Sequence, residues 1–230
     1  MSIADWNRFG APIIPTYLDA RESLNVAGGS EDSKSQAFYL MGATQGAWGY
    51  LYNGPDIGDF PVRDCSISGA IRTGTYFAAT QAYTGFFLRM QSLNPTSVLQ
   101  LDCYFIGFTQ VSTETGARTL DAWKIINGSR THLGSTVTLP RNNSFTQFEF
   151  QVSGTTPTIL MYRYNAGPLS FPGVGSWSSW IALGSDGSPG VLVNPGYAGF
   201  GQVIPGTWSS GYNVGNVIYF DLVRINKEVP

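Results

Sequence analysis

The stretch FTQFEFQVSG (145–154), followed by TILMYRYN (158–165), decides the fold class of this chain. Side chains along a β-strand point alternately to the two faces of its sheet. In the first segment this alternation separates three apolar residues from three polar ones: Phe148, Phe150 and Val152 against Gln147, Glu149 and Gln151. Such a pattern is typical of an antiparallel strand with one face on a core and the other in solvent. The second segment is its expected hairpin partner.

The rest of the chain repeats this kind of segment. We identify about ten to twelve strand-like runs, separated by glycine and proline turns, and no convincing helix. Asn127-Gly128 lies between two of these runs and predicts a two-residue type I′ hairpin. The spacing of the runs predicts an all-β sandwich or jelly roll. No fixed-period repeat is visible, which argues against a propeller or a β-helix.

The N-terminal residues differ from the remainder of the chain. They contain prolines, a glycine pair and a small charged cluster in an irregular pattern. We therefore divide the chain into an irregular N-terminal arm, residues 1–35, and a single β-sandwich domain, residues 36–230. Irregular segments with apolar side chains commonly become ordered against a partner, so we expect the arm to dock on one. The alternative is that this stretch wraps its own sandwich and pairs along an edge strand.

The closing run VIYFDLVRI (217–225) carries two charges in an otherwise apolar stretch. Asp221 and Arg224 are three positions apart, so simple alternation places them on opposite faces of the strand. We expect the face of Phe220 to point inward, which leaves Asp221 on the outer face and lets Arg224 reach water at the end of the strand. The alternative places Asp221 on the core side, where an unpaired carboxylate is very costly.

Composition excludes several classes of protein. The 230 residues carry a formal net charge of −2, and only 12% of them are charged. Lysine is confined to Lys34, Lys124 and Lys227, and the arginines are scattered singly, which argues against nucleic-acid binding. No apolar run is long enough for a transmembrane helix. The N-terminus lacks the pattern of a secretory signal peptide, so we expect synthesis in a cytoplasm; a signal removed upstream is the alternative.

Both cysteines share a strand face with apolar residues. Cys65 alternates with Ile67, and Cys103 alternates with Phe105, so we expect two buried, reduced thiols. A disulfide is the alternative. No Cys-x-x-Cys or His-x-x-x-His spacing is present, so we expect no metal site at these residues. The single histidine, His132, is expected to point to solvent.

Several segments follow the order of motifs in a known family: DFPVRDCSISGAIRT (59–73), TGFFLRMQ (84–91), NPGYAGFG (194–201) and VIYFDLVRI (217–225). Together they resemble the concanavalin A-like lectin/glucanase jelly rolls, above all their laminin G-like members. The resemblance covers residues 60–225, and the residues before it have no counterpart. It implies two antiparallel sheets, one flatter and one curved, packed face to face.

Glucanases of this fold carry two glutamates on one strand, because glycoside hydrolysis needs two carboxylates across the sugar bond. The glutamates of this chain are all isolated: Glu22, Glu31, Glu114, Glu149 and Glu228. There is also no second histidine and no phosphate-binding glycine loop. We therefore expect a protein that is not an enzyme.

Three aspartates cluster around a Gly/Pro turn: Asp56, Asp59 and Asp64. They form either a solvated turn or an oxygen-ligand Ca²⁺ site, which laminin G-like domains sometimes have. We favour the solvated turn and expect no cofactor, with a structural Ca²⁺ as the alternative.

Aromatic residues in two loop segments are the candidate ligand-binding residues: Trp177, Trp180, Trp208 and Tyr212. Flat rings on loops can stack on sugar rings, while nearby Asn and Ser side chains bond hydroxyl groups. The alternative is that these rings pin long loops onto the sandwich or fill a subunit interface, where Trp and Tyr are enriched.

Composition and resemblance together favour a structural or adhesive protein of a virus particle, above all of a bacteriophage. We expect a capsid decoration, fibre or tail-appendage protein that is made in the host cytoplasm and located in the virion. Its expected partners are other virion proteins or further copies of itself in a homo-oligomer, with a cell-surface glycan as candidate ligand and with neither nucleic acid nor membrane insertion. The alternatives are a carbohydrate-binding module of a bacterial surface or secreted protein, and a glycosidase with a disguised motif.

Overall fold

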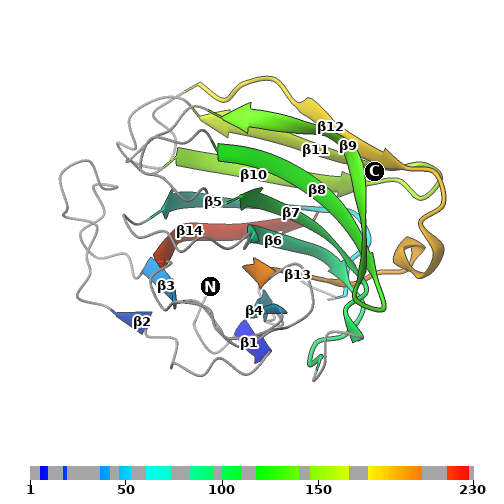
Figure 1. Ribbon diagram of the computed structural model, residues 1–230, viewed down its shortest axis with the longest axis horizontal. Helices are drawn as coiled ribbons and strands as arrows, with labels where there is room; N and C mark the ends of the chain where they lie inside the picture. The colour runs from blue at the N-terminus through cyan, green and yellow to red at the C-terminus, as the bar shows by residue number, and fades with distance from the viewer. Residues whose placement is uncertain are drawn as a thin grey trace.

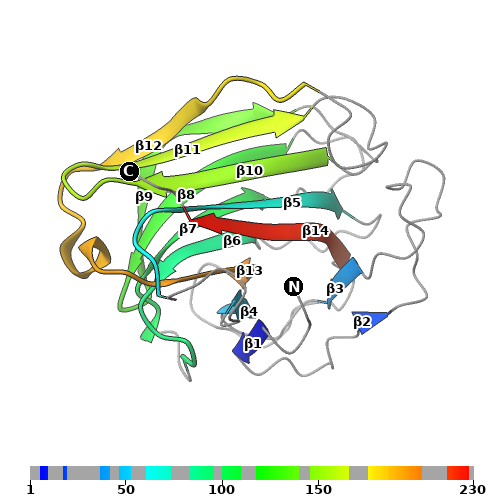
Figure 2. The same ribbon diagram turned by 180° about the vertical axis from the view of Figure 1, so that it is seen from behind.

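The computed structural model describes residues 6–9, 18–19, 37–41, 47–52, 61–73, 83–95, 100–109, 118–139, 146–165, 176–203 and 217–227. Across these ranges the backbone forms fourteen β-strands and one short 3₁₀ helix, η4 (Gly190–Val193), without any α-helix. No helix in these ranges is long and apolar enough to cross a membrane. Figures 1 and 2 show the strands from opposite sides.

The strands form two antiparallel sheets of seven strands each. Sheet A has the spatial order β1 (Trp6–Phe9), β4 (Ala47–Tyr52), β13 (Tyr197–Val203), β6 (Tyr83–Met90), β7 (Cys103–Thr109), β8 (Arg118–Ile126) and β9 (Ser129–Leu139). Sheet B has the order β12 (Ile181–Asp186), β11 (Thr158–Asn165), β10 (Thr146–Ser153), β5 (Cys65–Thr73), β14 (Val217–Lys227), β3 (Ala37–Met41) and β2 (Leu18–Asp19). The two views show these sheets as two layers, and β8 and β9 curve strongly along their length (Figures 1 and 2). The predicted all-β sandwich is confirmed.

The main core lies between the inner faces of the two sheets. The apolar face predicted for β10 points into it, because Phe148, Phe150 and Val152 are all buried there. Phe150 contacts Phe86 of β6 with ring centroids 5.1 Å apart, and Phe148 contacts Phe108 of β7 at 4.9 Å. Burying a side chain of this size stabilises a fold by about 1.5–3 kcal/mol. These ring contacts therefore hold the two layers together.

A second apolar cluster lies on the other face of sheet A, which we call its outer face. Its buried members are Leu51, Phe87, Met90, Leu101, Cys103, Phe105, Ile125 and Val203. The rings of Phe87 and Phe105, from β6 and β7, are 4.9 Å apart. Sheet A is therefore apolar on both faces over much of its area, unlike an antiparallel sheet with one face in water.

The two cysteines lie in different clusters. Cys65 belongs to the main core and Cys103 to the cluster on the outer face of sheet A. Neither forms a disulfide and both are fully buried, which confirms the prediction of two buried, reduced thiols. Burial, with a smaller contribution from Asp102, raises the pKa of the Cys103 thiol.

The predicted hairpin joins β8 to β9. Asn127 and Gly128 have φ angles of 48° and 75°, and Ile126 pairs directly with Ser129. Positive φ at both central residues defines the type I′ turn, so this prediction is confirmed. The turn sets the register of the first part of the hairpin.

The closing strand β14 departs from simple alternation. Asp221 pairs with Ala70 and Arg224 pairs with Ser68, with a register shift between the two pairs. Ala70 and Ser68 are two residues apart on β5, whereas Asp221 and Arg224 are three apart on β14, so a β-bulge inserts one residue and interrupts the simple alternation. Ile225 beyond the bulge is buried. The side chains of Asp221 and Arg224 lie outside the described ones, so the faces expected for them stay a prediction.

Two segments of residues 1–35 join the sandwich. β1 pairs with β4 at the edge of sheet A, and β2 pairs with β3 at the edge of sheet B. The Asn7 side chain also donates from Nδ2 to the carbonyl of Leu93 at 2.9 Å. These contacts favour the alternative in which this stretch pairs along edge strands. The division at residue 35 stays a prediction, because the other residues before it lie outside the described ranges.

Candidate functional site

Two of the predicted ligand-binding residues, Trp177 and Trp180, lie against one arginine. Their ring centroids are 5.0 and 4.6 Å from Cζ of Arg163 on β11. Backbone contacts hold this segment along β11, since Ser178 N donates to the Tyr164 carbonyl and Tyr164 N donates to Ser178 Oγ, at 2.9 and 3.1 Å. The two indoles and the guanidinium therefore form one unit at this edge of sheet B.

A buried carboxylate neutralises this arginine. Glu149 on β10, whose side chain is 7% exposed, accepts from Arg163 Nε at 2.6 Å and also from Nη2. Its other oxygen accepts from Ser66 Oγ of β5 at 2.7 Å. We call Glu149, Arg163, Trp177 and Trp180 the Trp177 stack. Its charges satisfy each other, which favours the alternative that these tryptophans pin a loop onto the sandwich.

The other two candidate residues, Trp208 and Tyr212, lie outside the described residues. The structure instead brings together a group that the sequence reasoning did not recognise as a site. That group surrounds His132, on the outer face of sheet A.

Asp121 is the polar centre of this group. It is only 4% exposed and accepts from His132 Nε2 at 2.9 Å, from Thr136 Oγ1 at 2.5 Å and from Thr119 Oγ1 at 3.2 Å. The pairing of β8 with β9 shifts register beside Asp121, and the extra residues lie in β9 between Leu133 and Val137. β8 itself pairs regularly with β7, so alternation places Asp121 on the same side of the sheet as Trp123. The prediction that His132 points to solvent is confirmed in that its side chain is 32% exposed, but the ring is also held by this carboxylate.

Two further aromatic groups and an arginine extend this group. Trp123 pairs with His132 across β8 and β9, and their rings meet edge to face at 4.7 Å. Tyr83 of β6 meets the Trp123 ring at 5.5 Å, also edge to face. The Arg130 guanidinium carbon lies 5.0 Å from the Trp123 ring centroid and 5.9 Å from that of Tyr83. We call Tyr83, Asp121, Trp123, Arg130 and His132 the Trp123 face.

A glycine on the intervening strand makes room for this arrangement. A Cβ atom on Gly107 of β7 would lie 2.4 Å from Cε1 of Phe105 and 3.1 Å from Cβ of Tyr83. A real Cβ atom essentially never comes within 2.4 Å of another atom, and 3.1 Å is already a tight contact, so a larger residue would displace one of these neighbours. Gly107 therefore lets Tyr83 lie across β7 toward Trp123.

The Trp123 face contains an unsatisfied hydrogen-bond donor. Nε1 of the Trp123 indole is buried and has no partner, and it is the single such side-chain atom among those described. Leaving a buried donor unpaired costs about 1–3 kcal/mol, and native structures rarely do so without a reason. An acceptor from outside the protein would satisfy it.

The pKa values of two groups on the Trp123 face are shifted by their surroundings. Burial lowers the pKa of Arg130. Burial also raises the pKa of Tyr83, the Asp121 carboxylate raises it further, and Arg130 opposes both. The phenol therefore stays neutral at ordinary pH and can serve as a hydrogen-bond donor and acceptor.

Part of this face could have been found from the sequence. A two-residue turn after Ile126 requires that Trp123 lies opposite His132, and Arg130 lies two residues before His132 on the same side of β9. Regular alternation along β8 also places Asp121 on the side of Trp123. What no sequence pattern indicated is the irregular pairing in β9 near Thr136, which also binds Asp121. The contribution of Tyr83 from a strand earlier in the chain was equally hidden.

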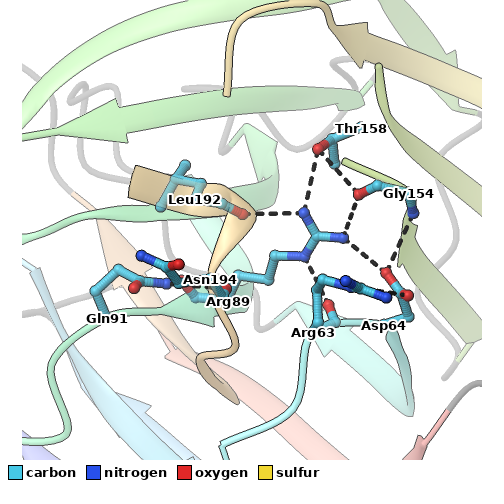
Figure 3. A network of polar contacts seen from close by, with 8 residues as sticks. All are labelled: Arg63, Asp64, Arg89, Gln91, Gly154, Thr158, Leu192 and Asn194. Atoms are coloured by element: carbon cyan, nitrogen blue, oxygen red, sulfur yellow. Dashed lines mark hydrogen bonds and ion pairs between the residues drawn. The ribbon is translucent and has the colours of Figure 1, made fainter. Parts of the chain in front are cut away.

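Asp64, one of the three aspartates considered for Ca²⁺, serves a buried arginine instead (Figure 3). Arg89 of β6 is fully buried, and its backbone has a φ angle of 51°. Its guanidinium donates to five oxygen atoms: those of Arg63 O at 2.6 Å, Thr158 Oγ1 at 3.1 Å, Leu192 O at 3.0 Å, Asp64 Oδ1 at 2.8 Å and Gly154 O at 2.6 Å. Every donor of the guanidinium thus has an acceptor.

This network occupies the Asp64 carboxylate. Besides Arg89, it accepts from Gly154 N at 3.1 Å and from Arg63 Nε at 3.3 Å. Asp56 and Asp59 lie outside the described residues. Within the described ranges, no three His, Cys, Asp or Glu side chains gather closely enough to hold a metal ion. The role of Asp64 is therefore to pair with Arg89 and join three loops at one end of the sandwich.

Comparison with known proteins places the fold. No protein-family model and no curated protein matches the sequence. Among solved structures, the potassium-bound carbohydrate recognition domain of Emp46p is similar with a TM-score of 0.57 and 8% identity, covering 99% of this chain and 91% of that one. The cellulose-induced protein Cip1 is similar at 0.54 and 16% identity, over 99% and 94% of the two chains. A legume lectin-like domain from Entamoeba histolytica is similar at 0.51 and 7%, over 99% and 92%.

At these identities the likeness concerns the fold alone. Each similarity extends over nearly the whole of both chains, so it reflects the arrangement of both sheets and not of one shared hairpin. The expectation drawn from the sequence motifs is confirmed at this level: the protein has the concanavalin A-like, lectin-like β-sandwich fold.

Proposed function

We propose that this protein is a non-enzymatic, lectin-like module that binds a glycan on the Trp123 face. The observation that carries the proposal is the buried Nε1 of Trp123, which lacks an acceptor in the described part of the molecule. A sugar hydroxyl at this position would accept that hydrogen bond. Arg130 partly covers the indole, but its long side chain can change rotamer without any movement of the strands.

The chemistry around the indole suits a sugar. His132 donates from Nε2 to Asp121, which in the neutral ring leaves Nδ1 as an acceptor. One indole donor and one imidazole acceptor match a hydroxyl group, which both accepts and donates. The rings of Trp123 and Tyr83 add an apolar surface against which the C–H groups of a pyranose can pack.

The same face supports binding rather than hydrolysis. Glycoside hydrolysis uses two carboxylates on either side of the scissile bond. Asp121 is the one carboxylate of the Trp123 face as described, and three side-chain donors already occupy it. A carboxylate held in this way orients His132 and has little capacity left for proton transfer.

Substitution of one tryptophan in each aromatic group tests the proposal. On a glycan array, wild-type protein should bind at least one glycan, Trp123→Ala should lose at least about tenfold in affinity, and Trp177→Ala should bind as wild type does. Thermal unfolding of both variants controls for loss of fold. Binding that survives Trp123→Ala and disappears in Trp177→Ala would instead assign the ligand to the Trp177 stack.

The biological setting that we propose is a virus particle, in which the module would make assembly contacts and bind a host-surface glycan. The support is compositional: 12% charged residues, three lysines and many glycines. The competing proposal is a carbohydrate-binding module of a bacterial surface or secreted protein. Capsid or tail genes next to this one, and recovery of the protein from purified particles by mass spectrometry, are expected for a virion protein. Genes for secreted polysaccharide-degrading proteins in their place would contradict it.

A further inference from the structure

Arg130 differs from the other arginines whose side chains are described. Arg63 and Arg89 both pair with Asp64, and Arg163 pairs with Glu149. Arg130, by contrast, has no ion pair and no hydrogen bond with any described residue, and its contacts are with the rings of Trp123 and Tyr83. The Trp123 face therefore holds a half-buried positive charge that no carboxylate among the described residues neutralises.

An unpaired guanidinium in this position selects for a negative partner. Removing a charge from water is unfavourable unless it is paired, and stacking on aromatic rings compensates only in part. A guanidinium presents its donors in a planar fork that fits the two oxygens of a carboxylate. The unpaired Nε1 of Trp123 is a further donor on the ring against which this fork lies. The Arg130 guanidinium and the Trp123 indole are therefore both hydrogen-bond donors that a ligand with acceptor atoms would satisfy.

The nearest acid on the face does not supply this partner. Asp121 directs its oxygens to His132, Thr136 and Thr119, and each of these contacts is 3.2 Å or shorter. The charge of Asp121 raises the pKa of Tyr83, whereas burial lowers the pKa of Arg130 and Tyr83 opposes that change. Arg130 and Asp121 therefore mark two electrostatically different ends of one face, with Tyr83 and Trp123 between them.

We infer that the glycan bound at the Trp123 face is acidic and that Arg130 binds the carboxylate of a uronic or sialic acid residue. This inference rests on the proposed function and specifies its ligand class. The carboxylate would lie at the Arg130 end, while the sugar ring packs on Trp123 and Tyr83. Hydroxyl groups at the opposite end would meet the imidazole of His132.

A matched pair of variants and a set of glycans test the inference. Arg130→Gln removes the positive charge that Arg130 contributes to the Trp123 face, and Arg63→Gln removes one equal charge at an arginine that is 48% exposed and remote from this face. The array should contain hexuronates, sialylated glycans, neutral glycans and sulfated glycans. Oligogalacturonate and its methyl ester give a matched pair of ligands that differ only in the carboxylate charge.

We expect the glycans bound by wild-type protein to carry carboxylates. Arg130→Gln should weaken their binding by about tenfold to a hundredfold, whereas Arg63→Gln should bind within about twofold of wild type. If wild-type protein binds neutral glycans and Arg130→Gln binds them equally well, the charge inference is wrong while the proposed function stands. Binding of sulfated glycans alone would reject the carboxylate. If no glycan binds, both the inference and the proposed function fail.

Discussion

Arg163 and Arg130 are both stacked on tryptophan, yet their surroundings differ in one decisive respect. Arg163 in the Trp177 stack lies against two indoles and pairs with Glu149, which Ser66 holds in turn. Arg130 on the Trp123 face lies against Trp123 and Tyr83 and pairs with no described carboxylate. In the Trp177 stack the charged groups pair with each other. On the Trp123 face the Arg130 cation and the indole donor of Trp123 have no partner among the described residues.

This difference teaches how to separate structural from binding aromatics. The loop position of Trp177 and Trp180 in the sequence drew attention to them, although their arginine is already neutralised. The more informative property is the pairing of the polar groups beside the rings. Satisfied groups stabilise the fold, whereas unsatisfied ones identify the place where another molecule can supply what is missing.

The largest expected effect comes from the charge pair behind the Trp123 face. Lys124, next to Trp123 in sequence, turns inward to Asp186 of β12 with Nζ 3.0 Å from Oδ2, and Asp186 also accepts from Tyr104 OH and from Ser188 N. Both partners are largely buried, so Asp186→Asn should lower the free energy of unfolding by about 3 kcal/mol at neutral pH. Urea unfolding measures this. A loss below about 1 kcal/mol would show that the pair does not join the sheets.

The pH dependence of this pair has a defined sign. Burial alone would raise the pKa of Asp186, but hydrogen bonds from Lys124, Ser188 and Tyr104 outweigh it and hold the pKa below its usual value of 3.8. A lowered folded-state pKa stabilises the protein above the unfolded-state value, and this contribution disappears as the pH falls below about 4. The stability difference between wild type and Asp186→Asn should therefore shrink below that pH.

Replacing Arg163 and Arg130 should change the stability of the protein by very different amounts. Arg163→Gln leaves Glu149 without its cation, so we expect a loss of about 2 kcal/mol in stability, moderated because Arg163 is 31% exposed. Arg130→Gln leaves no carboxylate behind and should change stability by less than about 0.5 kcal/mol. The double variant Glu149→Gln/Arg163→Gln should recover part of the loss, as a double-mutant cycle would measure. Equal losses of stability in Arg163→Gln and Arg130→Gln would contradict the proposal that Arg163 is paired and Arg130 is not.

The turn that aligns the Trp123 face should have a smaller effect. Gly128→Val places a β-branched residue at a φ of 75°, which should cost about 1 kcal/mol or more. Gly187→Ala is the matched control, because a Cβ there would meet nothing within 4 Å and should be tolerated. Thermal unfolding compares the two. A neutral Gly128→Val variant would mean that the turn does not determine the pairing of Trp123 with His132.

The sequence predicted the elements of this fold better than the connections between their side chains. Alternation identified the inward face of β10, and Asn127-Gly128 identified the hairpin, because both depend on residues close together in the chain. The irregular pairing of β14 between Asp221 and Arg224 was not predicted, because a bulge has no local signal. The Trp123 face was missed for a different reason: Tyr83 comes from a strand far away in the sequence, and the alternation of β8, which places Asp121 beside Trp123, does not identify Asp121 as the partner of His132. Trp177 and Trp180 were singled out from the sequence as candidate ligand-binding residues, but Arg163 and Glu149 could not be placed beside them from spacing alone.

A substitution at the unpaired donor itself should change affinity more than stability. Trp123→Phe keeps an aromatic ring but removes Nε1, which has no hydrogen bond to lose in the described structure. We therefore expect stability to fall by less than about 1 kcal/mol, while glycan affinity falls about fivefold because one neutral hydrogen bond to the ligand is gone. Titration calorimetry measures the affinity, and Trp177→Phe is the control that should leave it unchanged. Unaltered affinity in Trp123→Phe would mean that the buried donor never meets the ligand, and the Trp123 face would then differ from the Trp177 stack in charge alone.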